Sequence, residues 1–240
     1  MLQKIGFFHF GSAHSMPKAA LERALEEAGD AKNSLLVLPE AFNLGVSYRG
    51  EGERNFDRTV LTDLQELARR FAVAFVAGIV VRERCGPTPP HSAVYFVEGA
   101  SKALVCYKIG TDDMAGINYT ARSKQADFKN PIHYEGVRVG ALVCVDANPT
   151  VSLGPILWPR LRTVVGSSDI VCVPAHMGKS NFGNGRSGTD AALTSPWDNK
   201  RLILANSKAD GIDSFVTDGR GRILEPTAGG ALNKIGVFGF

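Results

Sequence analysis

Three side chains of complementary chemistry stand at or near the ends of apolar, strand-like runs: Glu40, Lys108 and Cys144. In α/β folds, ligands bind in the crevice at strand ends, so three such residues could converge on one site. A cysteine attacks as its thiolate, and a nearby lysine ammonium group lowers the pKa of the thiol. A glutamate can accept the thiol proton and later deprotonate a water molecule. The lysine can stabilise the oxyanion of a tetrahedral intermediate.

Each of these residues also has an ordinary structural interpretation. A cysteine in an apolar strand is commonly an inert core residue, and we expect Cys106 and Cys172 to be of that kind. A glutamate or lysine that follows a strand is usually solvated. Considered together, the shared placement and the local sequences of Glu40, Lys108 and Cys144 favour a catalytic role.

Strand-like and helix-like segments alternate along almost the whole chain. Helical periodicity predicts helices over Pro17–Gly29, Thr59–Phe71 and Ile156–Val165, the last disturbed by Pro159. Apolar runs and turn signals predict strands over Ile5–Phe10, Leu35–Leu38, Val73–Val81, Ala93–Val97, Ala103–Tyr107, Val137–Val145, Ile170–Val173, Leu202–Ala205, Ser214–Val216 and Ile223–Leu224.

The order of these segments indicates an α/β fold with mixed sheets. Ala93–Val97 and Ala103–Tyr107 form a hairpin pattern, whereas the N-terminal segments read as strand–helix–strand units. Such a mixture favours a mixed sheet, or paired sheets covered by helices, over a purely doubly wound sheet. No repeat or low-complexity linker divides the chain, so residues 1–240 are expected to form one domain.

Composition excludes several classes of protein. The 240 residues are 44% apolar and carry a net charge of only +3, with no run of five basic residues, so neither nucleic acid nor a membrane surface is an expected partner. The four cysteines form neither CxxC nor a zinc-spaced pair, so no metal site is expected. The N-terminal apolar run Ile5–Phe10 is too short for a secretory signal, and no stretch has transmembrane length. Buried thiols in a cytoplasmic protein are the expectation.

The local sequences around the three residues resemble those of a known family. Leu36–Phe42 resembles the apolar-strand–Pro–Glu–x–Phe element of the carbon–nitrogen hydrolase, or nitrilase, superfamily. Tyr107-Lys108 after a hairpin resembles the lysine element of that family, and Gly140–Asp146, with Pro149 soon after, resembles its cysteine elbow. The three elements follow one another in the order that the family has, and the resemblance covers nearly the whole chain.

The resemblance implies a four-layer αββα sandwich that commonly forms homodimers or larger homo-oligomers. It implies hydrolysis of small amides, nitriles or carbamoyl compounds through a cysteine acyl-enzyme, without cofactor or metal. Amides, cleaved to a carboxylic acid and ammonia, are the favoured substrates. Carried over by position, Glu40 is the general base, Lys108 the oxyanion stabiliser and Cys144 the nucleophile, and the backbone amide of Val145 is a second oxyanion donor.

The chain also departs from the family pattern. A basic run and a second glutamate usually follow the family's lysine, but Ile109–Asp113 stands here, and Asp112 or Asp113 is a candidate substitute. Val145 replaces an aromatic residue beside the cysteine. These departures leave open a second hypothesis, in which the sandwich is catalytically weak or inactive and acts as a binding or assembly subunit.

Three further features have both a functional and a structural interpretation. Asp146 could position a substrate or cap the turn after its strand. His176 could line the substrate pocket or be held by a hydrogen bond. Gly183–Gly188 matches GxGxxG, but His176–Phe182 separates it from the preceding strand, so nucleotide binding is the weaker interpretation of this loop.

Overall fold

The computed structural model describes two β-sheets and three α-helices. The described residues are 2–10, 17–29, 31–44, 59–81, 91–108, 129–147, 154–176, 200–207, 214–220, 222–224 and 234–240. The six-stranded sheet has the order β11-β1-β2-β3-β4-β5, and the five-stranded sheet has the order β10-β9-β8-β7-β6. Both sheets mix parallel with antiparallel pairs.

The six-stranded sheet has a parallel centre and antiparallel edges. Strands β1, β2 and β3 run parallel, whereas β11 joins β1, and β4 and β5 join β3, in antiparallel pairs. Its strands are β1 (Lys4–His9), β2 (Ser34–Leu38), β3 (Ala74–Val81), β4 (His91–Val97), β5 (Lys102–Tyr107) and β11 (Lys234–Gly239). Every residue of β2 and β3 is buried, as is typical of parallel strands covered on both faces.

The five-stranded sheet has a parallel core of β7, β8 and β9 with one antiparallel strand at each edge. Its strands are β6 (Ile132–Tyr134), β7 (Val137–Ala141), β8 (Ile170–Ala175), β9 (Arg201–Asn206) and β10 (Phe215–Val216). A short 3-10 turn, η2 (Cys144–Ala147), follows β7, and a similar turn, η1 (Phe42–Leu44), follows β2.

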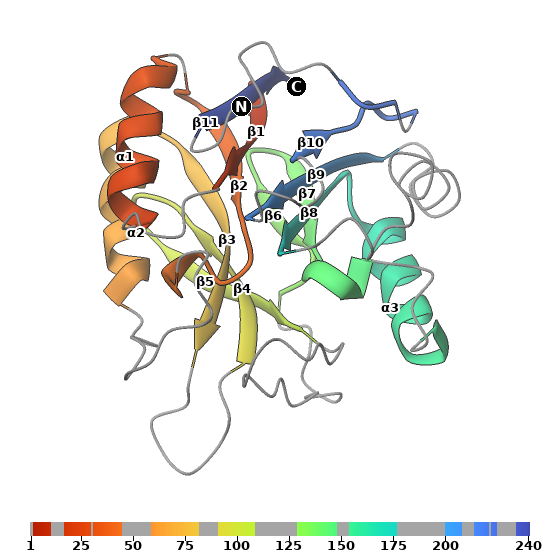
Figure 1. Ribbon diagram of the computed structural model, residues 1–240. Coiled ribbons are helices and arrows are strands. Elements are labelled where there is room, and N and C mark those ends of the chain that lie inside the picture. The colour runs from red at the N-terminus through yellow and green to blue at the C-terminus, as the bar shows by residue number, and fades with distance from the viewer. Residues whose placement is uncertain are drawn as a thin grey trace.

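The helices complete four layers. Helices α1 (Pro17–Ala28) and α2 (Thr59–Phe71) lie on the outer side of the six-stranded sheet, and α3 (Gly154–Ser167) lies beside the other sheet, as Figure 1 shows. The alternation along β2 explains this arrangement, because successive strand side chains point to opposite faces. Leu36 and Leu38 pack with the α1 and α2 side chains, whereas Leu35 and Val37 belong to the core that includes residues of both sheets.

The expected four-layer αββα sandwich is therefore confirmed. The helix predicted over Thr59–Phe71 has those bounds in the structure, and the predicted hairpin is the antiparallel pair β4–β5. Two predicted strands differ from the structure: the one expected over Val137–Val145 ends at Ala141, and the one expected over Ile223–Leu224 is only an isolated bridge between Ile223 and Thr217. No described helix is long and apolar enough to cross a membrane.

Candidate active site

Glu40 lies just beyond the end of β2, where the backbone turns away from the six-stranded sheet. Ala41, the next residue, has a φ of 54°, a left-handed conformation that L-residues rarely adopt. The side chain of Asn43 then acts as a short extension of the sheet, since its Nδ2 donates to Val80 O at 2.8 Å and its Oδ1 accepts from Val80 N at 2.9 Å. This carboxamide anchors the turn that carries Glu40 to β3.

A backbone hydrogen bond also joins Glu40 to the opposite sheet. Glu40 N donates to the carbonyl oxygen of Ala175, at the end of β8, over 3.3 Å. Beneath this contact, β3 carries Gly78, where a Cβ atom would lie 2.7 Å from Glu40 Cα and 2.8 Å from Pro174 Cβ. A glycine is therefore required for the two sheets to approach each other beside Glu40.

Lys108 follows β5 and reaches Glu40 across the end of the same sheet. Its backbone N–H donates to Ser92 O at 3.0 Å, which continues the pairing of the hairpin. Its Nζ lies 3.0 Å from Glu40 Oε1, and both side chains are completely buried. Because the desolvation of two charges offsets much of their attraction, a buried ion pair is a weak stabiliser. Its burial in this place is more readily explained by a functional role than by stability.

Cys144 occupies a sharp turn beyond β7. It has a φ of 48° and is the first residue of η2. A non-glycine residue in that region stores roughly 1–3 kcal/mol of strain, which is characteristic of functional sites. The preceding strand end is fixed by Asn130, whose side chain accepts from Ala141 N and donates to Ala141 O, at 3.0 and 2.8 Å.

The electrostatic environment keeps the thiol of Cys144 protonated at rest. Burial and the negative charge of Glu40 raise its pKa well above the ordinary value, and the charge of Lys108 lowers it by less. The lysine acts on the thiol pKa in the direction expected from the sequence, but complete burial disfavours the thiolate more strongly and the net pKa is raised. A hydrogen bond with Glu40 also raises the thiol pKa, so a carboxylate stands beside Cys144.

His176 adjoins the cysteine through its backbone. Its carbonyl oxygen lies 3.7 Å from Cys144 Sγ, and its ring Nδ1 lies 2.6 Å from Ser207 Oγ. Ser207 N donates in turn to Asn206 Oδ1 at 3.1 Å, so residues at the ends of β8 and β9 form a connected polar group next to the thiol.

Asp146 is directed toward a partner in α3. Its Oδ2 lies 2.5 Å from Arg160 Nη1, and Arg160 Nη2 donates to the carbonyl oxygen of Tyr107 over 3.1 Å. Val145 belongs to the η2 turn. Asp113 lies outside the described residues, as does the glycine-rich segment Gly183–Gly188.

Sequence reasoning missed three residues that shape this site: Asn43, Asn130 and Arg160. No local signal identifies them, because their partners lie between 11 and 53 positions away along the chain. Of the other cysteines, the two that the structure describes agree with expectation, since Cys106 and Cys172 are buried free thiols.

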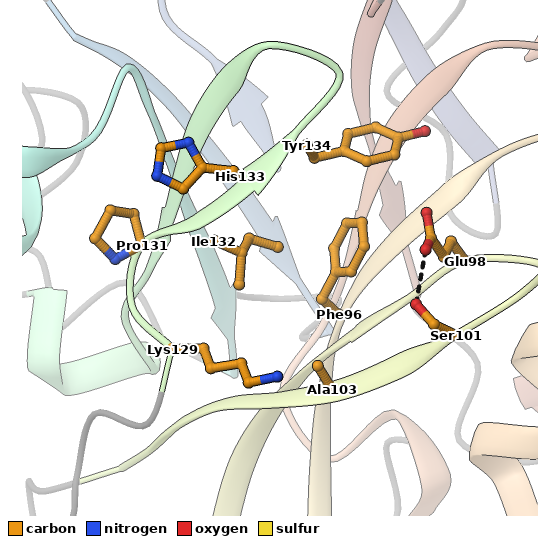
Figure 2. A pocket seen from close by; sticks show the side chains of 9 residues that line it. All are labelled: Phe96, Glu98, Ser101, Ala103, Lys129, Pro131, Ile132, His133 and Tyr134. Carbon is orange, nitrogen blue, oxygen red and sulfur yellow. Dashed lines mark hydrogen bonds between the residues drawn. The ribbon is translucent and has the colours of Figure 1, made fainter.

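A separate cavity of about 430 Å³ opens beside the edges of the two sheets. Figure 2 shows its lining, in which the rings of Phe96 and Tyr134 lie 5.1 Å apart and Glu98 accepts a hydrogen bond from Ser101. Neither Glu40, Lys108 nor Cys144 lines it, so this cavity is not the candidate active site. Within the described part of the chain, no group of three or more His, Cys, Asp or Glu residues is placed to hold a metal ion.

Comparisons with known proteins agree with the geometry at the level of the fold. No family model and no curated protein matches the sequence. Among solved structures, an amidase from Nesterenkonia sp. is similar with a TM-score of 0.69 and 16% identity, over 100% of this chain and 90% of that one. A carbon–nitrogen hydrolase from Helicobacter pylori G27 is similar with a TM-score of 0.68 and 18% identity, over 98% and 88% of the two chains.

Variants of the Nesterenkonia sp. AN1 amidase, which is assigned to the nitrilase superfamily, are also similar to this chain. One of them is in complex with butyramide, with a TM-score of 0.66 and 16% identity over 100% of this chain and 91% of that one. Another shows covalent addition of the acetamide moiety of fluoroacetamide at its active-site cysteine. The chain has the fold of the nitrilase-superfamily amidases and carbon–nitrogen hydrolases.

Proposed function

We propose that this chain is a member of the nitrilase superfamily that hydrolyses non-peptide carbon–nitrogen bonds with Cys144 as nucleophile. The observation that carries the proposal is the completely buried Glu40–Lys108 ion pair beside a cysteine held in a left-handed turn. Amides are the proposed substrates, since one of the similar structures is an amidase from Nesterenkonia sp. and a variant of that amidase is in complex with butyramide.

The first half of the proposed reaction forms an acyl-enzyme. Glu40 accepts the thiol proton as Cys144 Sγ attacks the carbonyl carbon of the amide. The oxyanion that forms is stabilised by the Lys108 ammonium group and by the backbone amide of Val145. The tetrahedral intermediate collapses as Glu40 returns the proton to the nitrogen, so ammonia leaves and a thioester remains on Cys144.

The second half regenerates the thiol. Glu40 deprotonates a water molecule, whose oxygen attacks the thioester carbon. The second tetrahedral intermediate expels the sulfur, which recovers a proton from Glu40, and the carboxylic acid is released. A thiol whose pKa is raised, and which therefore holds its proton before attack, suits this sequence, because the Glu40 carboxylate moves a proton in each half.

Substrate contacts form a further part of the proposal. Asp113, Asp146 and His176 remain proposed substrate-site residues, and His176 has the most direct support because its carbonyl oxygen adjoins the nucleophile. A homodimer or larger homo-oligomer is likewise proposed from the family resemblance, and a cytoplasmic location is proposed from the pattern of the cysteines in the sequence.

Ammonia release from a panel of small amides, nitriles and carbamoyl compounds tests the proposal. Cys144→Ala is expected to lower release by at least roughly 10³-fold, because the nucleophile is lost. Cys172→Ala is the matched control, since it removes another buried thiol and is expected to preserve most of the activity. A folded wild-type protein that releases ammonia from no compound would instead favour the binding or assembly role.

A further inference from the structure

The three proposed catalytic residues come from different sheets. Glu40 and Lys108 follow strands of the six-stranded sheet, whereas Cys144 follows β7 of the five-stranded sheet. Facing sheets are held together mainly by side-chain packing, which does not by itself fix distances at one edge to the accuracy that catalysis requires. Directional contacts between the sheets are therefore needed at the site.

One such contact ties Glu40 to the five-stranded sheet, through its backbone hydrogen bond to Ala175. A second involves Arg160, which projects from α3. Its guanidinium group binds Asp146 Oδ2 at 2.5 Å through Nη1 and the Tyr107 carbonyl oxygen at 3.1 Å through Nη2. Asp146 is two residues beyond Cys144, and Tyr107 immediately precedes Lys108.

The chemistry of the guanidinium group suits this connection. It is planar, permanently charged and able to donate in two fixed directions at once, which a lysine ammonium group at the end of a flexible chain does not do. The Arg160 side chain is only 7% exposed and that of Asp146 is completely buried, so water does not compete strongly for either bond. Since a buried ion pair is a poor source of net stability, this pair calls for a positional explanation.

We propose that Arg160 is a positioning residue that holds the Cys144 turn and the Lys108 strand end at a fixed separation. The inference deepens the proposed function and rests on it. Loss of the connection would misplace the oxyanion stabiliser relative to the nucleophile. That alignment acts in the transition state, so kcat should fall while KM changes little.

Arg160→Lys tests this role because it retains the positive charge for Asp146 but loses the two-directional donor. The expected result is a folded protein whose kcat on an amide cleaved by the wild type falls about 10- to 100-fold, with KM changed by less than about threefold. The matched control is Arg138→Lys, which makes the same substitution in the exposed pair between Arg138 and Asp169, and it should leave both constants unchanged.

A second readout is independent of any substrate. The charge of Lys108 lowers the pKa of the Cys144 thiol, so a less closely held Lys108 should raise it further. The thiolate absorbance of each protein, measured against pH with Cys144→Ala as the blank, should show a higher midpoint in Arg160→Lys than in the wild type. A wild-type protein without amidase activity would refute the proposed function, and the titration would still test the connection.

The inference is overturned if Arg160→Lys keeps the wild-type kcat and thiol midpoint, or if only KM changes. Should Arg160→Lys fail to fold, the double variant Asp146→Asn with Arg160→Met removes both charges together and leaves no lone buried charge. The double variant is expected to fold and to show the same loss of kcat and the same upward shift of the midpoint. Wild-type values in that folded protein would refute the positioning role.

Discussion

The thiol of Cys144 is influenced by two opposing charges of one ion pair. Glu40 raises its pKa and Lys108 lowers it, while burial makes the largest contribution, upward. The thiol of Cys144 therefore holds its proton near neutral pH. In the proposed reaction, the thiol is activated by transfer of its proton to Glu40.

Glu40→Gln separates two proposed effects of the carboxylate, which are to raise the pKa of the Cys144 thiol through its charge and to act as the base in amide hydrolysis. Because the negative charge of Glu40 is removed, the pKa of the Cys144 thiol should fall. Amide hydrolysis should collapse at the same time, since no base remains to accept the proton. Thiolate absorbance against pH and ammonia release measure the two effects on the same sample. A thiol midpoint that rises, or activity that survives, would contradict the assigned roles.

At the scale of the elements, β3 lies closely packed against the Glu40 turn and β8. Gly78→Ala would place a methyl group 2.7 Å from Glu40 Cα and 2.8 Å from the carbonyl oxygen of Pro39, which are backbone atoms that cannot rotate away. Overpacking of this kind costs about 1–3 kcal/mol in the free energy of unfolding. Because the displaced backbone is that of Glu40, kcat should fall as well.

Gly166→Ala in α3 is the matched control for that substitution. Apart from its chain neighbours and the backbone of its own helix, no atom lies within 4 Å of the position that its Cβ would take, and an alanine favours helix. It should leave activity unchanged and raise the free energy of unfolding by up to about 1 kcal/mol. Urea denaturation of the two variants measures the contrast, and equal effects would show that the contacts around Gly78 do not matter.

The starts of β7 and β8 are joined by an ion pair between Arg138 and Asp169. The Asp169 carboxylate accepts from Arg138 Nη2 at 2.7 Å and from Arg138 Nε at 3.1 Å, and these contacts lower its pKa to about 2. Because the pKa of Asp169 is lower in the folded than in the unfolded state, its ionisation stabilises the fold at pH values above the unfolded-state pKa. That stabilisation is lost as the pH falls through about 2.

Asp169→Asn should therefore remove a contribution to the free energy of unfolding that is itself lost in acid. Both side chains are more than 40% exposed, so water screens the pair and the expected loss at neutral pH is under about 1 kcal/mol. The difference in unfolding free energy between wild type and variant should shrink as the pH falls from about 4 toward 2. Urea unfolding at a series of pH values measures it. A difference that stays constant over this range would exclude the proposed linkage.

For the whole molecule, the sequence predicts the helices and central strands better than the edge strands of the two sheets. Helical periodicity identifies Thr59–Phe71, and continuous apolar runs identify the buried parallel strands β2 and β8. The two strands that were not predicted, β6 and β11, are edge strands. β6 has only three residues, and β11 contains Gly236 and Gly239 and is defined by its pairing with β1. Local propensity is weak where long-range pairing decides the conformation.

In the candidate site, too, local features can be predicted from the sequence and long-range contacts cannot. The residue types and order of Glu40, Lys108 and Cys144 are readable from the sequence because each sits at a recognisable strand end. The left-handed turn at Cys144 is not, because the apolar run Leu142-Val143 continues the strand pattern beyond Ala141. The connection from Arg160 to Tyr107 links residues 53 positions apart, so it emerges only when the sheets are assembled.

Labelling by fluoroacetamide tests the central claim, that Cys144 is a nucleophile assembled by residues of two sheets. Fluoride leaves carbon reluctantly, so an ordinary thiol reacts slowly, whereas a thiol activated beside a bound amide should react. Peptide mapping by mass spectrometry of the folded protein should find the acetamide moiety on Cys144 and not on Cys106 or Cys172, with no label in Cys144→Ala. Because the proposed reaction would also hydrolyse fluoroacetamide, ammonia release is measured on the same sample. Equal labelling of all the cysteines, or neither a label on Cys144 nor released ammonia, would contradict the account.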